Sequence, residues 1–135
     1  NNFINTFNNY QSLIKPSFAP PSWVFGPVWA VLYTIIFATY GYVFYLFLNK
    51  KVGFLVILPF ILNLIFNFAF TYFQFGLNNN LLAAIDIFLT LATIIWMFVA
   101  ILPFEPRIVY LNLPYFMWVS FATVLQFTIT YLNWK

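Results

Sequence analysis

The spacing of the charged side chains constrains this sequence more than any other feature. The 135 residues include five Lys or Arg and two Asp or Glu, which leave uncharged intervals at 16–49, 52–85, 87–104 and 108–134. About 20 apolar residues in a helix cross the ~30 Å hydrocarbon layer of a bilayer, and each interval is close to that length or longer. Because 64% of the residues are hydrophobic and only 5% are charged, a soluble domain is excluded.

Polar turns and helix breakers divide these intervals into four expected membrane helices. The spans are about 22–48, 52–75, 81–102 and 108–132. A polar and proline-rich entry segment at 1–21 precedes them, and the linkers at 49–51, 76–80 and 103–107 are too short for anything but antiparallel neighbours. Continuous apolar runs disfavour a β-barrel. The sequence predicts a single all-α membrane domain over 1–135, a polytopic helical bundle.

Several functions lack the residues that they need. The chain has no Cys and no His, so disulfides and the usual zinc and haem ligands are absent from the sequence, and we expect no required cofactor or metal. The five cations are too dispersed to form a nucleic-acid-binding patch. The turns that contain Lys50, Lys51 and Arg107 hold a slight excess of positive charge, so we expect this side to face the cytoplasm.

Polar side chains recur at helical spacing in three of the expected spans. In lipid such residues turn towards the bundle interior. The stripes are Asn63, Asn67, Thr71 and Gln74 in the second span, Asp86, Thr90 and Thr93 in the third, and Asn112, Ser120, Thr123, Gln126, Thr130 and Asn133 in the fourth. They either hold the helices together through hydrogen bonds worth roughly 0.6–2 kcal/mol each, or they form the polar edge of a binding site.

Asp86 is the one acid inside an expected span. A carboxyl group at this depth requires a partner. We expect Asn67 or Gln74 of the preceding helix, or the N-terminal end of its own helix, to stabilise it. A structural role is the favoured interpretation, and a proton-carrying role is the alternative.

Aromatic residues make up 25% of the chain and provide a second signal. Trp23, Tyr115 and Trp134 lie near expected span ends and are interpreted as interfacial anchors. Trp29 and Tyr33 lie one helical turn apart, on a face that Tyr40 and Phe44 continue. Flat rings opposite amide and hydroxyl stripes are what a large planar apolar ligand requires, although plain core packing is the alternative.

Three segments carry a resemblance to a known family. Residues 15–33 read KPSFAPPSWVFGPVWAVLY, residues 67–75 read NFAFTYFQF ahead of an Ala-Ile-Asp at 84–86, and residues 114–123 read PYFMWVSFAT. In this order and spacing they resemble the translocator proteins, also called tryptophan-rich sensory proteins (TspO/MBR), in their bacterial form. The prolines at 16, 20 and 21 form a stiff entry that could cover the mouth of the bundle.

The resemblance implies a membrane receptor or carrier that binds tetrapyrroles such as protoporphyrin IX, with sterols and aromatic drug-like compounds as further ligands. It also implies a homodimer in the lipid bilayer, and we expect the bacterial inner membrane. We add Asp86, the acid of the third span, to the residues that the resemblance implies. The candidate ligand-binding residues are then Trp29, Tyr33, Asn67, Phe70, Gln74, Asp86, Trp118 and Phe127.

Two further functions stay open. Some bacterial members of the family degrade protoporphyrin in light and oxygen with two tryptophans, of which one matches Trp29 and the other falls at Phe127. An enzyme of this kind would depend on Trp29. A proton or small-solute transport module that uses Asp86 is the other alternative.

The resemblance also sets an expectation about the number of helices. The family has five membrane helices, whereas four are visible here, because residues 1–13 contain no apolar run of sufficient length. A bundle that lacks one wall would expose its polar stripes to lipid, so we expect a partner subunit to cover them.

Overall fold

The computed structural model describes residues 13 and 15–134 and contains four helices that are long and apolar enough to span a membrane. They are Phe25–Leu48, Phe54–Gly76, Asn80–Ile101 and Leu113–Leu132. No strand occurs among the described residues. The predicted all-α membrane bundle is confirmed, and the chain is an integral, multi-pass membrane protein.

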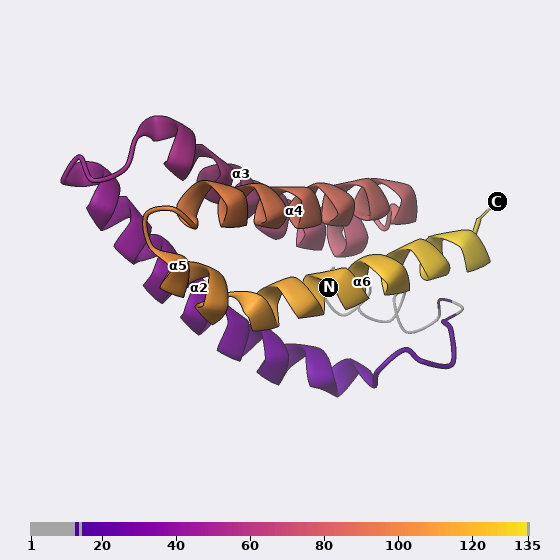
Figure 1. Ribbon diagram of the computed structural model, residues 1–135. Coiled ribbons are helices and arrows are strands. Elements are labelled where there is room, and N and C mark those ends of the chain that lie inside the picture. The colour runs from indigo at the N-terminus through magenta and orange to yellow at the C-terminus, as the bar shows by residue number, and fades with distance from the viewer. Residues whose placement is uncertain (1–12, 14, 135) are drawn as a thin grey trace.

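The long helices pack to different extents. In chain order the elements are η1 (Ser22–Val24), α2 (Phe25–Leu48), α3 (Phe54–Thr71), η2 (Tyr72–Gly76), α4 (Asn80–Ile101), α5 (Pro106–Leu111) and α6 (Leu113–Leu132). Helix α4 packs along both α3 and α6, while α2 runs obliquely and contacts α3 and α5 over a shorter length (Figure 1). The bundle is therefore tight around α4 and looser around α2.

Local sequence explains how two helices end and begin. At the end of α2, Lys50 adopts a left-handed conformation with φ of 59°. The amide of Lys51 then donates to the carbonyl of Leu46 at 2.8 Å, which closes the helix with a Schellman motif. At the start of α4, the side chain of Asn79 accepts a hydrogen bond from the amide of Leu82 at 2.9 Å, as an N-cap does.

The last expected span is not one helix. The backbone breaks at Asn112, with φ of −97° and ψ of 8°, and separates α5 from α6. Pro114 explains the break, because a proline is tolerated in the first turn of a new helix and not in the interior of a continuous one. The Asn112 amide stabilises the junction by donating to Thr39 Oγ1 at 3.1 Å and to the carbonyl of Ile108 at 2.9 Å.

The apolar core lies at the end of the bundle that contains the α2–α3 and α4–α5 turns. Its fully buried side chains include Ile36, Phe60, Ile94 and Met97. Tyr115 belongs to this core with 0% exposure, so its interpretation as an interfacial anchor is wrong. Its hydroxyl bonds to asparagines of α3, which compensates for burial of its polar end.

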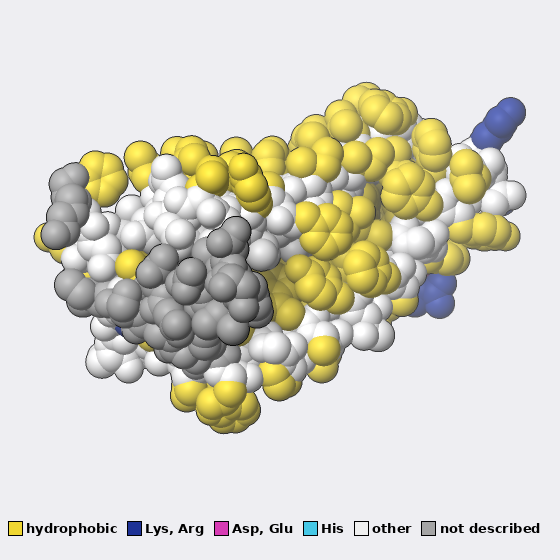
Figure 2. All heavy atoms as spheres, turned by 180° about the vertical axis from the view of Figure 1, so that it is seen from behind, with side chains coloured by type: hydrophobic (Ala, Val, Ile, Leu, Met, Phe, Trp, Pro, Cys, Tyr) yellow, Lys and Arg dark blue, Asp and Glu magenta, His cyan; other side chains and the backbone are white. Residues whose placement is uncertain are grey.

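The outer surface suits a lipid environment. Figure 2 shows hydrophobic side chains over much of the flank, with Lys and Arg near the ends. Trp23 and Trp134 are both exposed, as interfacial anchors would be. Arg107 donates to both carboxylate oxygens of Glu105, at 2.8 and 2.9 Å, and this pair lies on the polar α4–α5 turn. The arginine hydrogen bond holds the pKa of the Glu105 carboxyl below its usual range.

Candidate ligand-binding site

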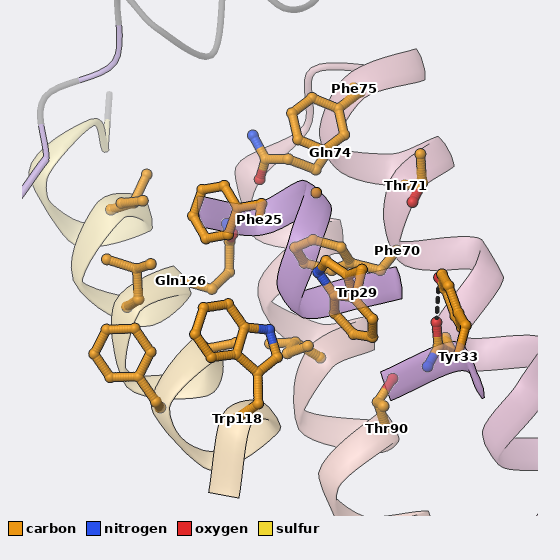
Figure 3. A pocket seen from close by; sticks show the side chains of 17 residues that line it. Phe25, Trp29, Tyr33, Phe70, Thr71, Gln74, Phe75, Thr90, Trp118 and Gln126 are labelled. Atoms are coloured by element: carbon orange, nitrogen blue, oxygen red, sulfur yellow. Dashed lines mark hydrogen bonds between the residues drawn. The ribbon is translucent and has the colours of Figure 1, made fainter. Parts of the chain in front are cut away.

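A cavity of about 350 Å³ opens between α2, α3, η2, α4 and α6 (Figure 3), and it borders the core at Ile87. Most of its 17 lining residues are aromatic or aliphatic. Its size lies at the lower end of the range for small-molecule sites, which are mostly apolar with a few polar groups. The lining side chains considered below are Phe25, Trp29, Tyr33, Asn67, Phe70, Gln74, Thr90, Trp118, Phe121 and Gln126.

Aromatic rings form two walls of the cavity. On α2, the ring centroids of Trp29 and Tyr33 lie 5.2 Å apart with 32° between the planes. On the side of α6, Trp118 packs edge-on against Phe25 at 5.9 Å and lies 5.7 Å from Phe121. Since the rings support one another, the cavity presents a preformed aromatic surface.

Hydrogen bonds fix the position of the Tyr33 ring. The Tyr33 hydroxyl donates to Asn67 Oδ1 at 3.1 Å, and Asn67 Nδ2 donates to the Tyr115 hydroxyl at 2.7 Å. The Tyr115 hydroxyl in turn donates to Asn63 Oδ1 at 3.0 Å. Asn67 therefore bonds through both its oxygen and its nitrogen to protein groups, and it supports the aromatic wall from behind.

The same network continues into the core. Asn63 Oδ1 also accepts from the Tyr40 hydroxyl at 2.7 Å, and Asn63 Nδ2 donates to Thr93 Oγ1 at 3.1 Å. Residues of α2, α3, α4 and α6 are thereby joined through one asparagine. These members of the stripes hold the helices together, so the first of the two interpretations applies to them.

A second polar cluster lies at the η2 end of the cavity. Gln74 Nε2 donates to Asn80 Oδ1 at 3.1 Å, and Gln126 Nε2 donates to the Asn80 carbonyl at 3.3 Å and to Thr130 Oγ1 at 3.2 Å. Gln74 Oε1 is buried and has no hydrogen-bond partner among the described residues. The cluster joins the first turn of α4 to η2 and α6.

Neither of the two side chains expected to pair with Asp86 does so. The side chain is 3% exposed, and its Oδ2 makes no hydrogen bond within the described part of the chain. Asn67 is engaged by Tyr33 and Tyr115, and Gln74 bonds to Asn80, so the prediction that either one pairs with Asp86 is wrong. Asp86 is also not among the residues that line the cavity.

The structure brings six of the eight candidate residues to one cavity: Trp29, Tyr33, Asn67, Phe70, Gln74 and Trp118. Phe127 is not among them, because its side chain is 46% exposed and lies in an outer groove with Leu81 and Phe88. Phe44 is exposed and Tyr40 is buried in the core, so neither extends the aromatic wall into the cavity.

Sequence reasoning missed some lining residues. Phe25 lies four residues before Trp29, so helical spacing alone places it on the same face of α2. Gln126 belongs to a polar stripe and to the stretch of the last helix, around Trp118 to Phe127, that the resemblance implies for the pocket, but the stripe alone does not single it out. Phe121 lies three residues after Trp118 and follows the same rule.

The proline-rich segment packs against the cavity end of the bundle. The rings of Phe18 and Phe121 meet edge-on with centroids 6.1 Å apart. Leu13 and Ala19 pack against the small cluster formed by Leu125 and Ile129, two cavity-lining residues of α6. This segment therefore packs against the cavity-lining part of α6. Residues 1–12 and 14, also part of the expected entry segment, lie outside the described residues.

The described residues, 13 and 15–134, contain no group of three or more His, Cys, Asp or Glu side chains that could hold a metal ion. The polar atoms of the cavity are amides, hydroxyls and indole nitrogens. Their arrangement suits hydrogen bonding to a largely apolar ligand.

Comparisons with known proteins agree with these features. The model of the TspO/MBR family matches residues 2–132. The chain is 38% identical to the tryptophan-rich protein TspO of Bacillus cereus over 126 residues, which cover 92% of the chain and 80% of that protein. It is 36% identical to the uncharacterized membrane protein YtaB of Bacillus subtilis, with 92% and 79% covered. It is 33% identical to the human translocator protein, with 89% and 72% covered.

Proposed function

The chain belongs to the TspO/MBR family, and from this premise we propose that it binds a planar hydrophobic ligand in the cavity, as a membrane receptor or carrier. The ligand class that we propose is a porphyrin, with protoporphyrin IX as its representative. Sterols and aromatic drug-like compounds are further candidates for the same site.

The observation that carries this proposal is the Trp29–Tyr33 pair. Its rings lie 5.2 Å apart on the wall of a mostly apolar cavity, and the Tyr33 hydroxyl is held by Asn67. A flat conjugated ring can stack on such a surface at little entropic cost, because the rings are already in place.

An apolar groove on the outside of the bundle supports access from the membrane. It lies between α2 and α6, where Val28, Val31 and Met117 contribute to its walls. Trp118 and Phe121 line both this groove and the cavity. Rotation of these two rings would join the cavity to the groove. A porphyrin is larger than the cavity, and it would then fit with part of its ring in the groove between α2 and α6.

Titration with protoporphyrin IX, followed by quenching of intrinsic tryptophan fluorescence, tests the proposal. We expect saturable quenching, with an apparent affinity that falls about 10-fold in Trp29→Ala, since loss of a stacking partner is worth roughly 1–2 kcal/mol. Trp96→Ala is the matched control, because Trp96 is an exposed residue of α4 that does not line the cavity. Quenching that does not saturate, or equal affinities for the two variants, would contradict the proposal.

Placement in a bacterial inner membrane and assembly as a homodimer complete the proposed function. The matches to two Bacillus proteins, one of them named a membrane protein, support placement in a bacterial cell membrane, which is the inner membrane where a cell has two. The loosely packed α2, whose outer face is apolar, supports the second, since a neighbouring copy would cover that face. Light scattering on the detergent-solubilised protein would give twice the 15.9 kDa chain mass for a dimer.

A further inference from the structure

The polar atoms of the cavity differ in whether they are already bonded. Tyr33 and Asn67 bond to each other, the Thr90 hydroxyl donates to the carbonyl of Asp86 at 2.9 Å, and the Gln126 amide donates to Asn80 and Thr130. Each of these groups already has at least one protein partner. Gln74 is different, because its Nε2 is bonded while its Oε1 has no partner in the described part of the chain.

Among the described residues, the surroundings of Gln74 provide no donor for this oxygen. The side chain is 2% exposed, and Figure 3 shows its amide between the rings of Phe25 and Phe75, at the η2 end of the cavity. It lies in the π-helical turn Tyr72–Gly76, an irregularity of a kind that is frequent at functional sites. A buried carbonyl oxygen without a donor is destabilising.

We propose that the ligand of this cavity carries an N–H or O–H donor on the edge that faces η2, and that Gln74 Oε1 accepts from it. The inference rests on the proposed function and narrows its ligand class. Planar compounds with an N–H or O–H on that edge, such as a lactam, a hydroxyl or a protonated carboxylic acid, meet the requirement, and those with only acceptors or only C–H bonds there do not. Protoporphyrin IX holds its pyrrole N–H groups inside the ring, so it meets the requirement through the O–H of a protonated propionic acid group.

The side chain can reach the ligand with a small movement. The terminal torsion of a glutamine has a broad energy minimum, so a small turn within the same rotamer brings Oε1 towards the cavity, while it lengthens the Nε2 bond to Asn80 Oδ1. The oxygen then gains a hydrogen bond that the empty site lacks. A ligand without a donor leaves the oxygen unpaired, and this difference in pairing discriminates between ligands of equal shape.

Carbazole and fluorene provide the test, because the two planar tricycles have nearly the same shape and differ by an N–H in place of a CH₂. Binding is measured by equilibrium dialysis of the detergent-solubilised protein, with protein-free micelles as the reference for partitioning. We expect carbazole to bind the wild type about 5- to 30-fold more tightly than fluorene. The ratio should fall to about one in Gln74→Met and be retained in Gln74→Glu, which keeps an acceptor.

Fluorene affinity also reports whether each variant is folded, since fluorene needs only the apolar walls. Equal affinities of the wild type for the two probes would overturn the inference, and so would a preference for carbazole that persists in Gln74→Met. Protoporphyrin IX is titrated on the same samples. If it binds saturably while the carbazole-to-fluorene ratio is one, the inference fails and the proposed function stands. If none of the three compounds binds saturably, both fail.

Discussion

Tyr115→Phe tests the hydrogen-bond network that positions the aromatic wall. The substitution keeps the buried ring and removes only the hydroxyl, which lies 2.7 Å from Asn67 Nδ2 and 3.0 Å from Asn63 Oδ1. Asn63 Oδ1 keeps the Tyr40 hydroxyl at 2.7 Å, whereas Asn67 Nδ2 loses its partner. One buried donor is therefore left without an acceptor.

The size of the effect follows from this count. An unsatisfied buried donor costs about 1–3 kcal/mol, and hydrogen bonds between membrane helices average about 0.6 and reach about 1.7 kcal/mol. We expect Tyr115→Phe to lower the free energy of unfolding by about 1–2 kcal/mol. Affinity for protoporphyrin IX should fall as well, because Asn67 still accepts from Tyr33 but loses the bond that fixes its own position.

Reversible unfolding in mixed micelles, followed by far-ultraviolet circular dichroism, measures the free energy. Tyr131→Phe is the matched control on the same helix, since Tyr131 is exposed and its removal should change the free energy by less than about 0.5 kcal/mol. If the two variants unfold alike, the buried network does not hold the helices together and the reasoning is refuted.

Three further predictions follow from single residues. Asp86→Asn should leave the affinity for protoporphyrin IX within about twofold of wild type, because Asp86 does not line the cavity; a tenfold loss in the fluorescence titration would contradict this. Lys50→Gly should raise the free energy of unfolding by about 1 kcal/mol, since Lys50 has a left-handed backbone with φ of 59°; Lys51→Gly is the control that should give no gain. The Glu105–Arg107 pair should persist at a pH where an ordinary Glu is already protonated. The lowered pKa of Glu105 means that its contribution to stability is complete above the unfolded-state pKa and is lost as the pH falls through the folded-state value. An NMR titration of the Glu105 carboxyl should therefore show a lower midpoint in the wild type than in Arg107→Gln, and equal midpoints would contradict the assignment.

The existence of the spans and the inward direction of the stripes could be predicted because burial of polar groups in lipid is costly. The hydrogen-bond partners of these polar side chains could not be predicted. Tyr115 lies near the start of its helix, which suggests an interface, but two asparagines of α3 accommodate its hydroxyl in the core. Such pairings depend on how α3 and α6 pack, and one sequence does not specify this.

Phe127 shows a different kind of error. It lies nine residues after Trp118, which at about 100° per residue places the two side chains on opposite faces of α6. Periodicity alone therefore indicated that both could not line one cavity, and the structure places only Trp118 there. The assignment came from the family resemblance, and the simpler helical argument would have corrected it.

Photoaffinity labelling tests the central claim most directly. A porphyrin that bears a diazirine is bound in the membrane and irradiated at a wavelength that activates the diazirine, and the labelled residues are identified by mass spectrometry. If a planar ligand occupies the cavity, the label appears at Trp29, Phe70 or Trp118, and excess unlabelled protoporphyrin IX suppresses it. Label confined to outward residues such as Phe88 and Tyr131, and insensitive to the competitor, would contradict the account.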